Sequence, residues 1–125
     1  MVEPLQQGDL FWIDGISPSL LEMGGRHPVV VVQGNRLNKS RIRTVIVCPV
    51  TSNVDRANDV GNVLLEQGEG GLTKRSVVNI SQFYTLDKER LAEYVGTLSL
   101  SRVQQIVAGI SLTFAVEISK IDAKD

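Results

Sequence analysis

The fold is decided by residues 27–50, which read HPVVVVQGNRLNKSRIRTVIVCPV. Two short runs dense in β-branched residues, 27–34 and 44–50, flank a polar and basic segment. Apolar runs of this length are typical of strands that are buried on both faces. Pro28 lies near the start of the first run, where a missing N–H is tolerated. The stretch therefore predicts two core strands joined by a connection at 35–43.

Short apolar runs bounded by glycine or polar residues predict further strands at 8–14, 61–67, 76–83 and 94–98. The glycine-rich GEGGL (68–72) separates the middle two, which are expected to form a hairpin. A loop is expected at 15–25, a side-chain-stabilised turn at 51–53 and one helical turn at 87–91.

The C-terminal part has the periodicity of a helix. Val103, Ile106, Val107, Ile110 and Phe114 follow the spacing i, i+3, i+4, i+7, i+11, which places them on one helical face. Ser99 or Ser101 can cap this helix, and Ser101 with Gln104 fits a capping box. Closely spaced strands followed by one helix predict a mainly β (α+β) fold, a small antiparallel barrel or curled sheet with a C-terminal amphipathic helix packed on it.

Composition excludes several classes of protein. The 125 residues, 42% hydrophobic and 22% charged, are expected to form a single globular domain over 1–125, with a core at about 7–118 and a polar tail at 119–125. One cysteine and one histidine allow neither an intrachain disulfide nor a Cys/His zinc site. Because there is no apolar run of about 20 residues and no basic leader, we expect a cytoplasmic protein without a membrane span.

Charge is distributed unevenly along the chain. No acidic residue lies between Glu22 and Asp55, whereas this stretch contains five cationic residues: Arg26, Arg36, Lys39, Arg41 and Arg43. Two interpretations remain open, a polyanion-binding surface or a solvated basic loop. Phosphate-loop, nucleophile-elbow and HExxH zinc motifs are absent, and Cys48 within its apolar run is expected to be buried and inert.

The ends of the two core strands carry the remaining chemistry. Arg26 and His27 precede the first strand, and Thr51 and Ser52 follow the second. If the strands are neighbours, a cation, an imidazole and a hydroxyl meet, which suits proton transfer and charge stabilisation during RNA phosphodiester cleavage. The alternatives are a structural histidine at a strand start and a threonine that serves only the turn.

The chain resembles the MazF/PemK family of toxin endoribonucleases over residues 7–110. The segments that carry the resemblance are GDLFWID, GGRHPVVVVQ, NRLNKSRIRTVIVCPVTSN, GNVLLEQGEGGLTKRSV, NISQFYTLDKERL and GTLS. The resemblance implies an SH3-like barrel of the CcdB/PemK type, acting as a homodimer. It also implies metal-independent, sequence-specific cleavage of single-stranded RNA (mRNA) through attack by the 2′-OH, leaving a 2′,3′-cyclic phosphate and a 5′-hydroxyl. The implied partner is a cognate antitoxin that places an acidic disordered segment over the RNA groove.

By position in the family pattern, Thr51 matches the catalytic threonine. The family pattern has arginine directly before proline, but here the order is Arg26-His27-Pro28. Either Arg26 reaches the phosphate through an irregular strand start, or His27 acts as general acid or base beside Arg26, or activity is weak and binding is retained. We expect His27 and Thr51 to work as a pair with Arg26 in support.

Other residues are candidates for RNA binding. Asn38, Lys39 and Arg41 lie on the basic connection, where they can follow the RNA backbone. Polar residues at strand ends that can read base edges are Asn35, Ser52, Asn53 and Gln82. Trp12 is expected in the core rather than in stacking. Two other functions stay open, a non-enzymatic CcdB-like gyrase inhibitor and an RNA-binding barrel without turnover.

Overall fold

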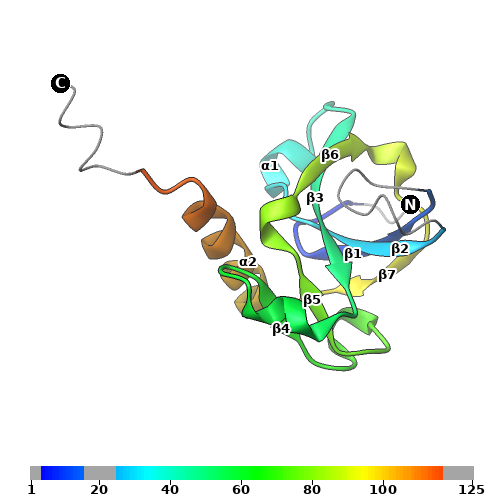
Figure 1. Ribbon diagram of the computed structural model, residues 1–125. Helices are drawn as coiled ribbons and strands as arrows, with labels where there is room; N and C mark the ends of the chain where they lie inside the picture. Colours follow the sequence, from blue (N-terminus) through cyan, green and yellow to red (C-terminus); the bar gives the residue numbers. More distant parts are fainter. Residues whose placement is uncertain (1–3, 16–24, 117–125) are drawn as a thin grey trace, which may run out of the picture.

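The computed structural model describes residues 4–15 and 25–116. These residues form an antiparallel sheet that curls into an incomplete barrel, with a helix packed beside β4 (Figure 1). The described strands are β1 (Asp9–Ile13), β2 (His27–Val31), β3 (Thr44–Thr51), β4 (Val63–Leu65), β5 (Ser76–Val78), β6 (Tyr84–Asp87) and β7 (Tyr94–Thr97). The described α-helices are α1 (Asn35–Asn38) and α2 (Leu100–Thr113), and short 3-10 turns are η2 (Val54–Asn58), η3 (Glu69–Gly71), η4 (Ile80–Gln82) and η5 (Lys88–Arg90).

The strand order is β4-β5-β3-β2-β1-β7, and β6 also pairs with β3. β3 curls the sheet because its first half pairs with β6 and its last two residues pair with β5. β2 and β3 are antiparallel, with Val29 opposite Pro49 and Val31 opposite Val47. The predicted hairpin of β4 and β5 is confirmed.

Glycines bring the two edges of the curled sheet together. A Cβ on Gly96 of β7 would overlap the carbonyl oxygen of Gly70, and a Cβ on Gly71 would overlap that of Val95. Gly70 and Gly71 also have positive φ angles of 59° and 83°, which L side chains rarely adopt. The glycine turn predicted at 68–72 therefore also closes the barrel against β7.

The valine runs are buried on both faces of the sheet, as predicted. Val30 and Val32 belong to a core cluster that includes residues of β4, β5 and α2. Val29 and Val31 belong to a second cluster with Phe11 and residues of β3 and β6. Alternate side chains of a strand point to opposite faces, so one run serves both cores.

Helix α2 begins after Ser99, whose hydroxyl accepts a hydrogen bond from the Arg102 N–H at 3.2 Å. The predicted capping box at Ser101 is wrong, because that residue already lies inside the helix. The buried face carries Val103, Ile106 and Gly109. Val107 and Phe114 were expected on that face, but they are 39% and 65% exposed. The helix packs closely at Gly109, where an added Cβ would overlap the Gly61 carbonyl oxygen just before β4, and Phe114 lies at the C-cap beyond the last helical turn.

Three further expectations are modified. The connection 35–43 contains the short helix α1, and the strand expected at 76–83 ends at Val78 and is followed by η4. The chain bends there because the Asn62 side chain accepts the Ile80 N–H at 2.8 Å. The sequence did not predict β6. Most of the loop expected at 15–25 and the whole tail at 119–125 lie outside the described residues. None of the described helices has the length and apolar content needed to cross a bilayer.

Candidate functional site

The ends of several strands meet on one side of the barrel. β2 begins at His27 and β3 ends at Thr51. Val29 pairs with Pro49 in the antiparallel register, so continuing the same register by two residues places His27 opposite Thr51. A pocket of about 580 Å³ opens at this end of the sheet. Arg26, His27, Thr51 and Ser52 all line it. The chain reversals thus bring the cation, the imidazole and the hydroxyl to one place, as the sequence suggested.

Arg26 is the accessible cation of this group. Its side chain is 46% exposed, and its guanidinium lies over the Trp12 ring at 4.9 Å from the ring centre. Nη2 donates to Glu93 Oε1 at 2.6 Å. The expectation that Trp12 is a core residue is wrong, because the indole is half-buried and lines the pocket.

His27 lies in a very different environment from its neighbour. The residue is 3% exposed, and neither ring nitrogen has a hydrogen-bond partner among the described residues. Burial lowers the pKa of His27, the nearby Gly25 backbone offsets part of this effect, and the charge of Arg90 lowers the pKa further. The burial therefore favours the neutral imidazole, and both ring nitrogens are shielded from solvent.

Thr51 is half-buried at the end of β3, where the chain turns. Its Oγ1 accepts the Asn53 N–H at 3.1 Å, and Asn53 Oδ1 in turn accepts the Asp55 N–H at 3.2 Å. These bonds confirm the turn predicted at 51–53. No described residue accepts the hydroxyl hydrogen of Thr51, which remains available to a ligand.

Three other residues of the pocket wall were not predicted from the sequence. Lys74 adds a second cation, Tyr94 adds a second aromatic ring, and Glu93 is the only carboxylate among the described lining residues. No sequence motif marks them, because each is a single residue in a separate segment. Exposed aromatic rings combined with cations are typical of sites that bind unpaired nucleotides.

The structure separates the basic connection from this pocket. Residues 35–43 join the end of β2 to the start of β3, so they lie at the opposite end of this strand pair. The five-residue strand β2 spans roughly 15 Å between the two ends. Lys39 and Arg41 are exposed there. Asn35 is exposed too, but its Oδ1 accepts the Gln7 N–H at 2.7 Å.

Asn38 is not presented on the surface. The residue is 7% exposed, and its amide both donates to the Gln33 carbonyl at 2.8 Å and accepts from Gln33 Nε2 at 2.9 Å. Its burial and hydrogen bonds indicate a structural role in the connection rather than a contact with RNA. Gln82 is exposed on η4, near α2, and Asn53 is exposed beside the pocket, but neither lines it.

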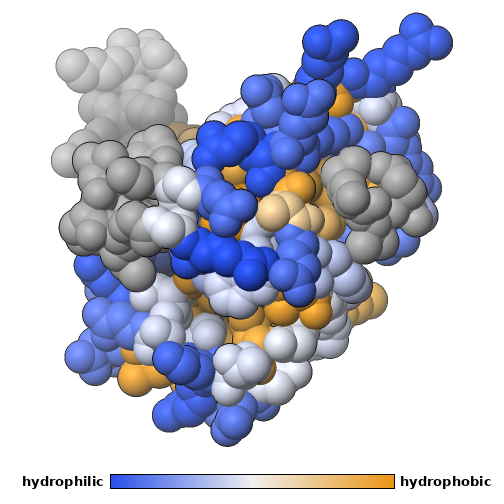
Figure 2. All heavy atoms as spheres, turned by 90° about the vertical axis from the view of Figure 1, so that its right-hand side faces the viewer, coloured by the Kyte–Doolittle hydropathy of each residue, from blue (hydrophilic) through white to orange (hydrophobic). Residues whose placement is uncertain are grey.

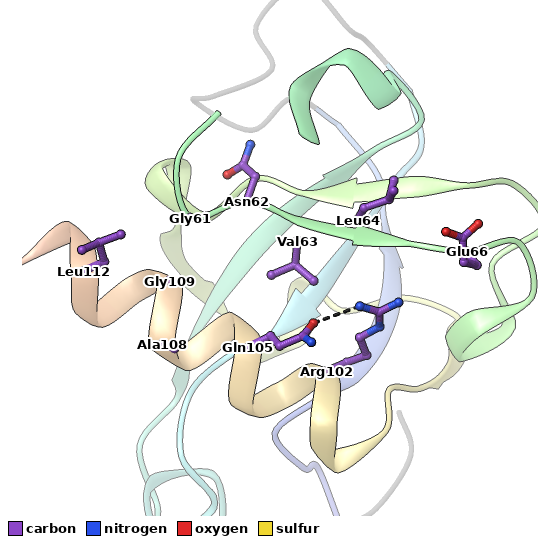
Figure 3. A pocket seen from close by; sticks show the side chains of 10 residues that line it. All are labelled: Gly61, Asn62, Val63, Leu64, Glu66, Arg102, Gln105, Ala108, Gly109 and Leu112. Carbon is purple, nitrogen blue, oxygen red and sulfur yellow. Dashed lines mark hydrogen bonds between the residues drawn. The ribbon is translucent and has the colours of Figure 1, made fainter. Parts of the chain in front are cut away.

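A second groove of about 630 Å³ lies between β4 and α2 (Figure 3). Its charged groups already have partners: Arg102 Nη2 contacts Glu69 Oε2 at 2.8 Å, Arg102 Nη1 donates to Gln105, and Glu66 binds Arg75. The hydrogen bond from Arg102 lowers the pKa of Glu69. In the part of the chain that the structure describes, no three metal-ligating side chains come together.

Hydrophilic side chains dominate the face shown in Figure 2, and apolar atoms are visible between them in small patches. Exposed large apolar residues do occur on α2 and after it, at Leu112, Phe114 and Val116. Of the two hollows described, the pocket at the strand ends is the one with an accessible hydroxyl and an exposed cation, so it is the stronger candidate for chemistry.

Comparisons with known proteins agree on one family. Residues 6–114 match the family described as PemK-like, MazF-like toxin of type II toxin-antitoxin system. Endoribonuclease MazF6 of Mycobacterium tuberculosis is 34% identical over 106 residues, which cover 85% of this chain and 93% of that protein. MazF from Deinococcus radiodurans has a similar fold, with a TM-score of 0.70 and 23% identity over 91% of this chain and 100% of that one. An endoribonuclease in complex with its cognate antitoxin, from a mycobacterial species, gives a TM-score of 0.68 at 18% identity, over 90% of this chain and 95% of that one.

Proposed function

This chain belongs to the PemK-like, MazF-like family of type II toxins, and on that premise we propose that it is an endoribonuclease toxin that cleaves single-stranded RNA at the pocket formed by the ends of β2 and β3. The observation that carries the proposal is that Arg26, His27 and Thr51 line one pocket. Trp12, Tyr94 and Lys74 support it, because they supply stacking surfaces and positive charge for an unpaired strand.

We assign the phosphate contacts to Arg26 and Thr51. A guanidinium can donate two parallel hydrogen bonds to phosphate oxygens, and its charge stabilises the dianionic phosphorane as negative charge develops. The Thr51 hydroxyl, whose hydrogen has no acceptor among the described residues, can donate to a non-bridging oxygen. Arg26 is favoured over His27 for this contact because its side chain is 46% exposed, whereas His27 is 3% exposed.

We assign proton transfer to His27. Removal of the 2′-OH proton requires an unprotonated base, and the lowered pKa of His27 keeps its ring in that form at neutral pH. The 2′-oxygen then attacks phosphorus, the P–O5′ bond breaks, and the 5′-oxygen leaves with a proton from water. The products are a 2′,3′-cyclic phosphate and a 5′-hydroxyl, and the step requires the buried ring to gain access to the ribose.

The partners follow from the same premise. We infer that a cognate antitoxin binds this chain and that the toxin acts in the cytoplasm as a homodimer. An acidic segment of the antitoxin would complement Arg26 and Lys74 at the pocket. The solved mycobacterial endoribonuclease–antitoxin complex, with its similar fold, supports this inference. A test is co-expression and co-purification of the toxin with a candidate antitoxin.

The activity is tested by incubating the purified protein with single-stranded RNA in the presence of EDTA. We expect cleavage products that end in a 2′,3′-cyclic phosphate, and intact RNA at a large excess of protein would contradict the proposal. Binding without products would instead indicate an RNA-binding barrel. The gyrase-inhibitor alternative is not favoured, because the matched relatives are endoribonucleases; it predicts DNA damage without loss of mRNA.

A further inference from the structure

Two residues of the pocket hold the guanidinium of Arg26. Nη2 lies 2.6 Å from Glu93 Oε1, and the guanidinium carbon lies 4.9 Å from the centre of the Trp12 ring. The backbone fixes the positions of these two residues, because the Trp12 N–H donates to the Glu93 carbonyl at 2.8 Å and the Ala92 N–H donates to the Trp12 carbonyl at 2.9 Å. Indole and carboxylate are thus anchored side by side, and Arg26 bridges them.

Glu93 binds the cation that a phosphate in this pocket would also contact. A carboxylate and a phosphodiester offer similar acceptor oxygens to a guanidinium, so both compete for the same N–H groups. Glu93 is also the only carboxylate among the described residues of the pocket wall. Arg26 and Lys74 are positively charged residues of the same wall. A polyanion that enters the pocket therefore competes with Glu93 for Arg26.

The ion pair of Arg26 and Glu93 is exposed enough to open when another partner binds. Its side chains are 46% and 68% exposed, so water competes for both partners and the pair contributes little to folding. The residues are 67 positions apart in the sequence and lie on different segments, Arg26 before β2 and Glu93 before β7. The pair of Arg102 and Glu69 is more enclosed, at 25% and 27% exposure, so water screens it less.

We propose that Glu93 is a positioning residue that holds Arg26 over Trp12 before RNA binds and yields it to a phosphate of the bound RNA. The inference rests on the proposed function and deepens it. Glu93 therefore sets the affinity of the site for its ligands. An RNA strand with a phosphate within reach of Arg26 displaces the carboxylate, whereas a ligand without such a phosphate leaves the ion pair of Arg26 and Glu93 intact.

The test measures binding without cleavage. A short single-stranded RNA with 2′-deoxy substitution at each linkage keeps its phosphates but lacks the nucleophile, and its binding is followed by fluorescence anisotropy over a series of salt concentrations. For Glu93→Gln we expect about two- to fivefold tighter binding, the factor by which an exposed ion pair of this kind can oppose it. The log–log salt slope should stay close to that of the wild type, because both proteins make the same phosphate contact through Arg26 and only the competing carboxylate is removed.

Glu66→Gln is the matched control. It removes the same charge from an exposed ion pair with Arg75 at 3.1 Å, and Glu66 does not line this pocket. We expect its RNA affinity to equal that of the wild type. In cleavage assays Glu93→Gln should lower KM and leave kcat within twofold, a split that a merely structural residue would not produce.

The double variant Arg26→Ala/Glu93→Gln shows whether Glu93 acts through Arg26. We expect it to bind no more tightly than Arg26→Ala, and a gain that persists would overturn the inference in favour of general electrostatics. Unchanged or weaker binding by Glu93→Gln, when Arg26→Ala has lost affinity, would overturn the role of Glu93 and leave the proposed function intact. Wild-type binding by Arg26→Ala would instead show that RNA binds elsewhere, and the proposed function would fail with the inference.

Discussion

Arg26 and His27 are adjacent in the chain, yet the side chain of Arg26 is 46% exposed and His27 is 3% exposed. Arg26 reaches Trp12 and Glu93 at the pocket, whereas both ring nitrogens of His27 are buried without a hydrogen-bond partner among the described residues. Neighbouring residues at a strand start point to opposite faces, which separates the two side chains. The two residues therefore lead to different predictions.

Replacement of Arg26 tests the phosphate contact. We expect Arg26→Ala to lower kcat/KM by about 10- to 150-fold, the range set by charge-assisted hydrogen bonds of about 1.5–3 kcal/mol. Stability should change by less than about 1 kcal/mol, because the ion pair with Glu93 is exposed. The assay is single-turnover cleavage of a labelled RNA, with circular dichroism to verify the fold. Cleavage within twofold of wild type would refute this role.

Replacement of His27 tests the buried imidazole through stability. Because the native pKa is lowered, the unfolded chain binds more protons than the native protein once pH falls below about 6.5. The free energy of unfolding should therefore decrease as pH is lowered from 7.5 through 6.5. Above that range His27 should make no contribution to the pH dependence of stability. The measurement is urea unfolding at a series of pH values for the wild type and His27→Leu.

The variant His27→Leu should lose that part of the pH dependence. At pH 7.5 it should be as stable as the wild type or more stable, because it removes two buried polar atoms that have no partner. A parallel decrease for both proteins would show that other groups cause the effect. Because proton transfer is assigned to His27, we also expect His27→Leu to abolish cleavage while RNA binding persists.

Thr51 serves both the turn and the proposed phosphate contact. We expect Thr51→Ala to cost about 0.5–1.5 kcal/mol of stability, since Oγ1 accepts the Asn53 N–H, and to reduce cleavage at least about tenfold. Thr51→Ser keeps the hydroxyl and should retain most of the activity. Thr85→Ala, on an exposed position of β6, is the control with no expected effect on cleavage. Equal activity of Thr51→Ala and Thr85→Ala would remove Thr51 from the mechanism.

Barrel closure depends on the absence of a side chain at Gly96. We expect Gly96→Ala to destabilise the protein by at least about 1–3 kcal/mol, because its Cβ would overlap the Gly70 carbonyl and the backbone must move. Gly34→Ala is the matched control, since nothing lies within 4 Å of a Cβ there and its φ is −64°. The measurement is the melting temperature of both variants. Equal melting temperatures would contradict the role of Gly96 in closing the barrel.

The two basic regions should differ in their effect on short ligands. A trinucleotide in the pocket cannot span the strand length that separates Lys39 and Arg41 from Thr51. We therefore expect Lys74→Ala to weaken trinucleotide binding, whereas Lys39→Ala and Arg41→Ala leave it unchanged. All three substitutions should weaken the binding of longer RNAs if the basic connection contacts the RNA backbone. A loss of trinucleotide affinity in Lys39→Ala would show that the site extends to the connection.

The sequence by itself determined the strands that form the core. Runs such as 29–32 are too apolar and too β-branched to be stable anywhere except between two buried layers, so local composition suffices to place them. The helix at the C-terminus and the hairpin around 68–72 follow from periodicity and glycine placement in the same way. The end of β5 and the strand β6 did not follow, because a tertiary hydrogen bond from the Ile80 N–H to the Asn62 side chain bends the chain there.

The tertiary structure alone decided which polar residues share a site. Sequence position grouped Arg26 with His27 and the basic connection with both, but strand alternation buried His27, and the length of β2 separated the connection from the pocket. Trp12, Lys74 and Glu93 entered the pocket because antiparallel strands and the turn after η3 converge there. Such contacts depend on register and curvature, which involve residues far apart in the chain, and no local pattern encodes them.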